Sequence, residues 1–205
     1  MRELILPLDE KQTRDLNVGE QVVLTGKIFT GRESFYIRAV EENILPELDY
    51  SNINVMMHVG PVMKKDNSSW EVLGLTPTTS IRMEKYAGIL IEKLKTRALI
   101  GKGTMGKTTT DAMKKIGAVH LAPIAIYPVL LARQIVRVER VFFLEDIGAT
   151  EATWIFDVKN FGPFLVDIDS KGNNYFNNIV VSSKDKLKQV YDKNRIPLDY
   201  KYTEI

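Results

Sequence analysis

The chain has 205 residues, of which 44% are hydrophobic and 26% are charged, and its formal net charge is +2. These values are ordinary for a one-domain globular protein, and so small a charge argues against a nucleic-acid partner. The sequence contains no cysteine, which excludes disulfides, thiolate metal sites and cysteine nucleophiles, and it contains two histidines. We expect no metal site in this chain, no membrane span and no signal peptide, and therefore a cytoplasmic protein.

The pattern of apolar residues predicts strands first, and then strands in alternation with helices. The predicted elements are, in chain order, strand 3–8, helix 10–16 capped by Asp9, strand 21–29, helix 33–42, strand 54–59, strand 70–75, a helix that follows Ser80 and runs to about Leu94, strand 97–100, helix 109–116 stopped by Gly117, strand 118–122, helix 129–133, strands 136–144, 154–158 and 164–168, and a charge-rich helix over 182–193. We expect strands 54–59 and 70–75 to form a hairpin. The order favours a single α/β domain over 1–205, with a mixed, partly parallel sheet, helices on one side, extra β structure on the other and an amphipathic tail helix from about 182.

Two hydroxyl residues stand where a predicted strand gives way to a helix, in the segment TPTTSIRM. Thr78 and Thr79 can cap the free backbone amides there, and the same amides and the helix dipole favour an anion. Arg82 follows one turn later, and its planar guanidinium is suited to binding a carboxylate through two hydrogen bonds. The alternative is an ordinary helix cap with a solvent-facing arginine, which is favoured when the segment is taken alone.

Glycines flank Lys102 directly after a predicted strand, in the segment IGKGTMGK, and strand ends are where α/β sheets present ligand sites. Gly101 and Gly103 would let the backbone approach a bound anion closely. The letters that end at Thr108 also match the phosphate-binding loop GxxxxGK[ST], with a strand before it and a helix after it. A nucleotide-binding site is therefore a rival interpretation. It also needs an acid at the end of a neighbouring strand to hold Mg²⁺, and only Asp146, which follows a glutamate, is available.

Other candidate residues carry weaker signals. Arg32 follows a strand end and a glycine, and alone it is typical of a surface arginine that opens a helix. His58 and His120 lie inside apolar strand patterns, which favours hydrogen-bonded core residues over ligands or bases. The alternating charges over 182–193 predict a solvated helix face.

Seven segments taken in order resemble a known family. They are GKIFTGRE, HVGPV, TPTTSIRM, IGKGTMG, GAVHLAP, ATEATW and VKNFGPFLVDIDSKGN, and they span the chain from about Val18 to Tyr175. The series resembles the β subunit of class I, iron–sulfur-dependent fumarate hydratase and of the related L-tartrate dehydratase. The resemblance also accounts for the nucleotide-loop letters, because this family binds no nucleotide there.

The resemblance implies the swivelling β/β/α three-layer fold and a hydro-lyase that reversibly hydrates fumarate to (S)-malate, a reaction of the tricarboxylic acid cycle. It places a [4Fe–4S] cluster in a cysteine-bearing α subunit and not in this chain, within a hetero-oligomer such as a dimer of αβ pairs. By motif position, the catalytic roles fall on Thr78, Arg82 and Lys102. Small-dicarboxylate binding falls on Arg32, Arg82, Lys102, Thr79, Gly101 and Gly103.

The resemblance also implies a mechanism in which an open iron of the cluster acts as a Lewis acid on the substrate hydroxyl and a nearby carboxylate. Loss of the proton next to a carboxylate places negative charge on that carboxylate. Arg32, Arg82 and Lys102 would stabilise this charge, most strongly in a water-excluded cleft. Thr78 would take the carbon-bound proton, and its alkoxide would need the helix N-terminus and nearby cations to stabilise it.

Three segments depart from the family pattern. The histidine that commonly follows Ala-Arg-Asp is absent after Glu33, Thr104 replaces a glycine, and the bulky segment 124–128 replaces a Gly-Gly turn. These changes leave fumarate/malate as the first substrate, L-tartrate as the second, and a methyl-substituted dicarboxylate as the third. They also motivate an alternative of another class, a non-catalytic dicarboxylate-binding module with the same fold.

Overall fold

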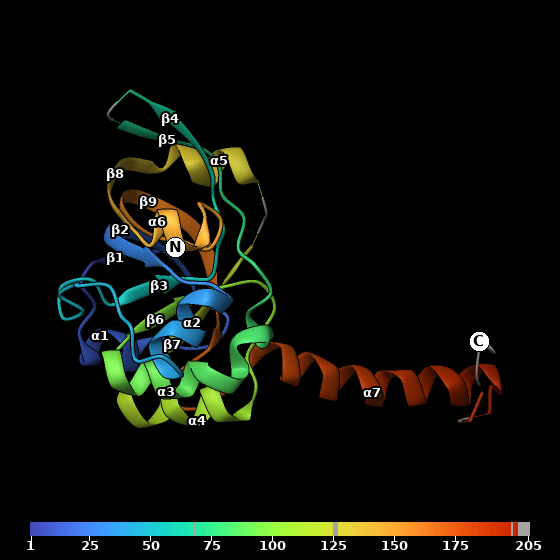
Figure 1. Cartoon of the computed structure of the whole chain (residues 1–205). Helices are drawn as coiled ribbons and strands as arrows, with labels where there is room; N and C mark the ends of the chain where they lie inside the picture. The colour runs from blue at the N-terminus through green and yellow to red at the C-terminus, as the bar shows by residue number, and fades with distance from the viewer. Residues whose placement is uncertain (68, 125–126, 198, 201–205) are drawn as a thin grey trace.

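The computed structural model describes residues 1–67, 69–124, 127–197 and 199–200, and it contains a mixed sheet of seven strands in the order β1-β2-β3-β6-β7-β9-β8 (Figure 1). These strands are β1 (Arg2–Ile5), β2 (Gln21–Thr30), β3 (Val55–Met57), β6 (Ala98–Ile100), β7 (Val119–Pro123), β8 (Ile135–Phe142) and β9 (Thr153–Ile168). The pairs β1–β2, β2–β3, β3–β6 and β6–β7 are parallel. In contrast, β9 runs antiparallel to β2, β7 and β8.

The long strands β2 and β9 close part of the sheet on itself. One edge of β2 pairs with β3 through Phe29 and Thr30, and β2 also pairs with β9 along most of its length. Because β9 pairs in turn with β7, the strands β2, β3, β6, β7 and β9 form a ring. The ring has a parallel side, and an antiparallel side that β8 extends.

The parallel strands are buried on both faces, and successive side chains of a strand point to opposite faces. In β3, Val55 and Met57 belong to the core enclosed by the ring, whereas Met56 belongs to the core under the helices. β6 repeats this alternation, with Leu99 on the helix side. Two cores therefore separate antiparallel strands, parallel strands and helices, which confirms the predicted mixed α/β fold.

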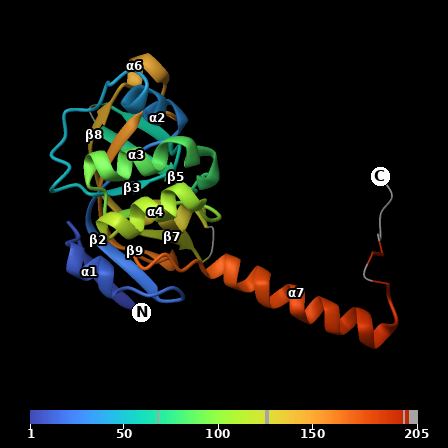
Figure 2. The same ribbon diagram turned by 90° about the horizontal axis from the view of Figure 1, so that it is seen from below.

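The helix layer covers the outer face of the parallel strands, as Figure 2 shows from below. It comprises α2 (Glu33–Val40), the 3-10 turn η1 (Ser80–Met83), α3 (Glu84–Leu94) and α4 (Lys107–Ile116). In α3, Ala87, Leu90 and Ile91 are buried, and in α4 Ala112 and Met113 join them in the same core. These positions recur at the helical spacing on which the sequence prediction rested.

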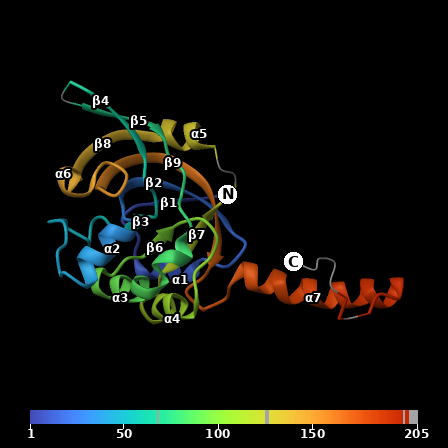
Figure 3. The same cartoon turned by 45° about the vertical axis from the view of Figure 1, so that its right-hand side comes forward.

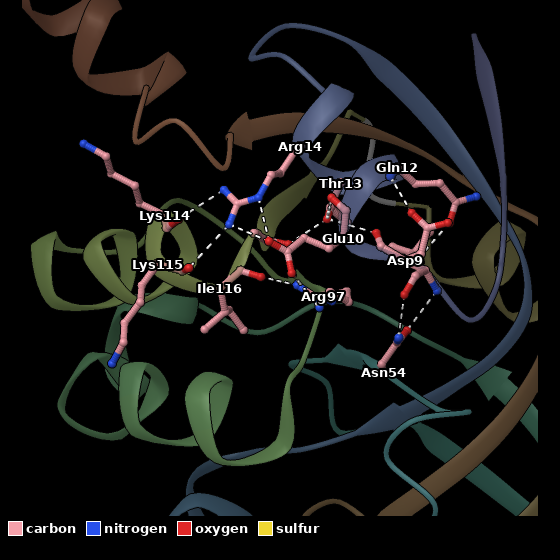
Figure 4. Close-up of polar contacts among 12 residues, drawn as sticks. Asp9, Glu10, Gln12, Thr13, Arg14, Asn54, Arg97, Lys114, Lys115 and Ile116 are labelled. Carbon is pink, nitrogen blue, oxygen red and sulfur yellow. Dashed lines mark hydrogen bonds and ion pairs between the residues drawn. The ribbon is translucent and has the colours of Figure 1, made fainter.

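The helix α1 (Glu10–Asp15) fastens the C-terminal end of α4 (Figure 4). Arg14 and Arg97 donate hydrogen bonds to the carbonyls of residues 114–117, and the hydroxyl of Thr13 donates to the last of these at 2.6 Å. Cations and donors are the groups that stabilise a helix C-terminus. Glu10 pairs with both guanidiniums, and its hydrogen bond from Arg14 is the main reason that its pKa lies below the ordinary value.

The predicted hairpin between strands 54–59 and 70–75 is wrong. β3 stays in the main sheet, and the hairpin joins β4 (Val62–Asp66) to β5 (Ser69–Gly74) in an antiparallel pair. The charged segment 64–66, for which the sequence predicted no strand, belongs to β4, and its side chains remain exposed on an edge. Figure 3 shows this hairpin beside β8 and α5 (Pro128–Arg133).

Two expectations also change in the C-terminal part. The strands predicted over 154–158 and 164–168 are one strand, β9, which is irregular at Asn160 and Gly162, where φ is positive. The tail helix begins earlier than predicted, as α7 (Tyr175–Asn194), because the side chain of Asn174 caps it and accepts from the amide of Asn177. The remaining helix, α6 (Leu144–Ile147), is a single short turn.

Beyond its first turn, α7 extends away from the body of the molecule in all three views (Figures 1, 2 and 3). The prediction of a solvated helix face is confirmed, and several apolar side chains are exposed as well. These are Ile179, Val180, Val181, Leu187 and Val190. Within the described part of the chain, no helix combines the length and the apolar character needed to cross a membrane.

Candidate active site

The parallel strand order brings separate sequence motifs to one edge of the sheet. β2, β3 and β6 run in the same direction, and their carboxyl ends lead into Arg32, Gly60 and Lys102 respectively. The segment 77–80 is added along the same edge through a parallel bridge between Thr79 and Lys102. The carboxyl ends of parallel strands are the usual place for ligand sites in α/β folds.

Arg32 lies between two carboxylates and is not a surface arginine, since its side chain is only 19% exposed. Its Nε lies 3.2 Å from Glu151 Oε1 and 3.6 Å from Glu33 Oε2. Neither pair has hydrogen-bond geometry, and the buried Nε–H finds no acceptor among the described residues. Gly60 makes room for this guanidinium, because a Cβ there would lie 2.6 Å from Arg32 Nη1. Arg32 is therefore held between two acids, with an Nε–H whose hydrogen-bonding capacity is unused among the described residues.

The structure changes the role predicted for the two threonines. Thr79 occupies the cap position of η1 (Ser80–Met83), but its side chain makes no capping hydrogen bond. The amide of Thr78 donates to the carbonyl of His58 at 2.6 Å, and the amide of the first residue of η1 donates to that of Lys102 at 2.9 Å. The expectation that these threonines cap a helix is wrong, because no capping hydrogen bond forms, and the amides of Thr78 and Ser80 already have carbonyl partners.

A single carboxylate links two of the predicted cations. Arg82 donates through Nη2 to Thr78 Oγ1, and its Nε lies 3.0 Å from Glu33 Oε1. The other oxygen of Glu33 faces Arg32. We call Arg32, Thr78, Arg82 and Lys102 the cradle. Two guanidiniums from different elements thus face the two oxygens of one carboxylate.

Lys102 completes the cradle from a turn with a fixed backbone. Its amide donates to the carbonyl of Thr78 at 2.9 Å, while its side chain is exposed and forms no ion pair with any residue that the structure describes. A Cβ on Gly101 would lie 1.6 Å from Ser80 Oγ, so packing requires glycine there. At Gly103 the space is open but φ is +77°, so the backbone conformation favours glycine.

The nucleotide-binding interpretation fails at the N-terminus of α4. A phosphate-binding loop leaves these amides free for the phosphate. Here Glu84 accepts from the amide of Gly106 at 2.8 Å, and from the amide and hydroxyl of Thr109 at 3.1 Å and 2.6 Å. Lys107, the lysine of the nucleotide pattern, pairs instead with Asp111 on the surface at 2.6 Å. A carboxylate of the chain itself occupies the position that a phosphate would need.

Replacing Glu84 with glutamine should lower the free energy of unfolding by about 1–3 kcal/mol, because one amide group would then face a backbone donor that needs an acceptor. Urea unfolding measures the change. Glu92 is the matched control, since it lies on the same helix and pairs with Lys115 at the surface. Glu92→Gln should cost no more than about 1 kcal/mol. Equal losses in the two variants would contradict the capping role.

A buried polar chain lies directly beneath the cradle. Tyr36 Oη is 2.7 Å from His58 Nε2, and His58 Nδ1 is 2.9 Å from Ser80 Oγ. Ser80 Oγ is also 3.1 Å from His120 Nε2, and His120 Nδ1 is 2.6 Å from Asp167 Oδ1. All five side chains are fully buried. Burial, with a smaller contribution from His120, lowers the pKa of His58 to about 3. The prediction that both histidines are hydrogen-bonded core residues is confirmed.

The departures from the family pattern have local explanations. Thr104 Oγ1 accepts from Asn174 Nδ2 at 2.8 Å, which ties the loop after Lys102 to the start of α7. In the segment after Glu33, which lacks the family's histidine, Tyr36 is buried and joins the polar chain. Residues 125–126 of the bulky segment lie outside the described residues.

Two features bear on whether this chain holds a complete site. The sequence has no cysteine, and among the described residues no group of three His, Asp or Glu side chains could hold a metal ion, so the donors present do not suit an iron–sulfur cluster. The cradle also lines none of the cavity of about 500 Å³ that lies between the hairpin and β8, beside Trp70, Val129 and Val136. The cradle is therefore not part of that cavity.

Several residues of the site were missed by sequence reasoning. Glu33 and Glu151 hold the arginines, and Glu151 also accepts from the amide of Ser34 at 3.1 Å, at the start of α2. Both acids stand inside the motifs GKIFTGRE and ATEATW, and each lies next to a strand end. An acid beside a candidate anion-binding arginine was the available signal. Ser80 and Asp167 offered no comparable signal, because only the fold brings them to the histidines.

The fold and the cradle together define an α/β domain whose basic side chains gather at one edge of the sheet, from two strand ends and from η1. The model of the family described as the fumarase C-terminus matches residues 3–179. The chain belongs to this family.

Named relatives agree with this membership. The chain is 36% identical over 186 residues to a Methanocaldococcus jannaschii protein provisionally named L(+)-tartrate dehydratase subunit beta. The match covers 89% of this chain and 95% of the relative. It is 35% identical to the L(+)-tartrate dehydratase subunit beta of Escherichia coli K12, over 83% of this chain and 84% of the relative. A Geobacillus stearothermophilus protein provisionally named class I fumarate hydratase is 41% identical, and the match spans 35% of its length.

Proposed function

We propose that this chain is the β subunit of a hydro-lyase that reversibly hydrates fumarate to (S)-malate, and that it acts only with a separate α subunit. The observation that carries the proposal is the sharing of the Glu33 carboxylate by Arg32 and Arg82. A substrate carboxylate would compete with Glu33 for these guanidiniums. The relatives named as tartrate dehydratase subunits and as a fumarate hydratase support the reaction class.

The cradle would act on the charge that develops during proton removal. When the proton next to a carboxylate leaves, negative charge spreads onto that carboxylate, and fixed cations stabilise it most where water is excluded. Arg32 offers a buried Nε–H, and Lys102 offers an ammonium free of partners among the described residues. Both would bind the substrate more tightly as its charge grows, and this lowers the barrier.

Thr78 would be the base that takes the proton from carbon. A threonine hydroxyl becomes a useful base only when its alkoxide is stabilised. Arg82 already donates to Thr78 Oγ1, so its guanidinium would supply that stabilisation.

The α subunit would complete the site. Since this chain offers no suitable ligands, we assign the [4Fe–4S] cluster, which supplies Lewis-acid activation of the substrate hydroxyl, to a cysteine-bearing α subunit. The side chain of Arg82 is 46% exposed, so a second surface is needed to exclude water from it. We further propose that residues 1–205 form one domain with α7 as its tail, in a cytoplasmic hetero-oligomer such as a dimer of αβ pairs.

Reconstitution tests the proposal. The chain is co-expressed anaerobically with the cysteine-bearing α subunit of the same organism, and the pair is assayed on fumarate, L-tartrate and methyl-substituted dicarboxylates. We expect loss of fumarate absorbance with the pair and no activity with this chain alone. Faster turnover of L-tartrate would reassign the substrate and keep the class. An inactive pair, combined with calorimetric binding of a dicarboxylate by the chain alone, would instead establish a non-catalytic binding module.

A further inference from the structure

We propose that Ser80 is a positioning residue of the active site. Its hydroxyl, fixed by two buried histidines, sets the segment that carries Thr78 and Arg82 against the turn that carries Lys102. The inference rests on the proposed function, in which these side chains form the cradle. It assigns a task to the buried polar chain, which the mechanism above does not use.

Ser80 lies at the junction of the two halves of the cradle. Its amide donates to the carbonyl of Lys102, and the amide of Lys102 donates to the carbonyl of Thr78, both at 2.9 Å. Its side chain fills the space over Gly101, where a Cβ would lie 1.6 Å from Ser80 Oγ and 3.0 Å from His58 Nδ1. A shift of this hydroxyl therefore moves the Lys102 turn relative to Thr78.

The donors and acceptors available in the buried polar chain allow its hydrogen bonds to run in one direction, from Tyr36 to Asp167. The phenol of Tyr36, whose pKa burial raises well above its ordinary value, stays protonated and donates to His58 Nε2. Neutral His58 then donates from Nδ1 to Ser80 Oγ, and Ser80 donates its only proton to His120 Nε2. His120 donates from Nδ1 to the carboxylate of Asp167. Every link is satisfied in this order, so the Ser80 hydroxyl has one orientation.

The buried polar chain lowers the stability of the fold, so packing alone does not explain its presence. Asp167 is fully buried, and its Oδ2 has no hydrogen-bond partner among the described residues. Burial of a charged or incompletely paired group opposes folding, and an apolar core of the same volume would avoid the cost. Buried polar groups instead specify a single geometry in several known systems. A site that must hold its donors to within a fraction of an ångström benefits from such specification.

The test compares Ser80→Ala with Thr13→Ala. Both variants remove a fully buried hydroxyl that makes hydrogen bonds, but Thr13 bonds the far end of α4. In the isolated chain, Ser80→Ala should speed hydrogen exchange at the Lys102 amide at least about tenfold, whereas Thr13→Ala should leave it unchanged. In the reconstituted pair, Ser80→Ala should lower kcat by about 10- to 100-fold with little change in KM, as small misplacements do. Equal behaviour of the two variants overturns the proposal.

Nitrogen-15 NMR of the wild-type chain supplies an independent signature. In both His58 and His120 the proton should be found on Nδ1, and a proton on Nε2 of either ring overturns the proposal. If Ser80→Ala does not fold, Asp167→Ala replaces it: this variant removes the acceptor that holds the proton of His120 at Nδ1, so it should produce the same faster exchange and lower kcat. Wild-type values in that variant count against the proposal. An inactive wild-type pair would refute the proposed function, while the exchange rates would still decide this inference.

Discussion

Replacing Lys102 with alanine should lower kcat of the reconstituted enzyme by about 10²- to 10³-fold, the usual cost of removing one group that stabilises developing negative charge. The side chain is exposed and unpaired among the described residues, so its removal should change the free energy of unfolding by no more than about 0.5 kcal/mol. Steady-state kinetics and urea unfolding of the same preparation separate the two effects. A near-normal rate would refute the assignment of Lys102.

Lys107 is the matched control for this variant. It lies five positions later, at the start of α4, it is also exposed, and it pairs only with Asp111 at the surface. Lys107→Ala should retain wild-type turnover. In a nucleotide-binding loop the order would be reversed, because Lys107 would then contact the phosphates. Loss of activity with Lys107→Ala alone would restore the nucleotide interpretation.

Replacing Gly101 with alanine should destabilise the protein by at least about 1–3 kcal/mol, the cost of overpacking a rigid core. The new Cβ would overlap Ser80 Oγ, and the backbone would have to move with Lys102 attached. We therefore expect a lower urea midpoint and a loss of activity comparable to that of Lys102→Ala. Both are measured on the reconstituted pair.

Gly103→Ala separates steric overlap from backbone strain. No atom lies within 4 Å of the added Cβ, so only the left-handed conformation opposes the substitution, at about 1–2 kcal/mol. The histidine NMR signals should shift in Gly101→Ala and stay in place in Gly103→Ala. Shifts in Gly103→Ala alone would contradict the assigned packing at Gly101.

Local patterns predicted most of the fold. Asp9 caps α1 and Gly117 ends α4 in a left-handed conformation, because both signals act within a few residues of the chain. The apolar spacing that predicted α3 matches the face that packs on the sheet. The hairpin was mispaired because strand pairing depends on distant partners, and a charged edge strand such as 62–66 has the same composition as a turn.

Taken alone, each residue of the cradle carried a weak signal, and it was the resemblance that grouped the four, so their roles stay a prediction. Their partners could not be predicted from sequence. Glu84 lies 22 positions before Gly106, and Asp167 lies 47 positions after His120, so only the closed ring of strands brings these groups together. The fold also gives carbonyl partners to the amides of Thr78 and Ser80, which the sequence did not predict.

The hydroxyl of Ser80 occupies the space that a side chain at position 101 would need. The Cβ of Ser80 lies 3.0 Å from the position of a Cβ at 101, whereas Ser80 Oγ lies only 1.6 Å from it, so an alanine at 101 requires the loss of the hydroxyl at 80. The two positions should therefore covary among homologues as a single unit. A homologue with a side chain at 101 would have given up the hydroxyl that joins the two histidines, and it would have to orient its Lys102 equivalent by other means.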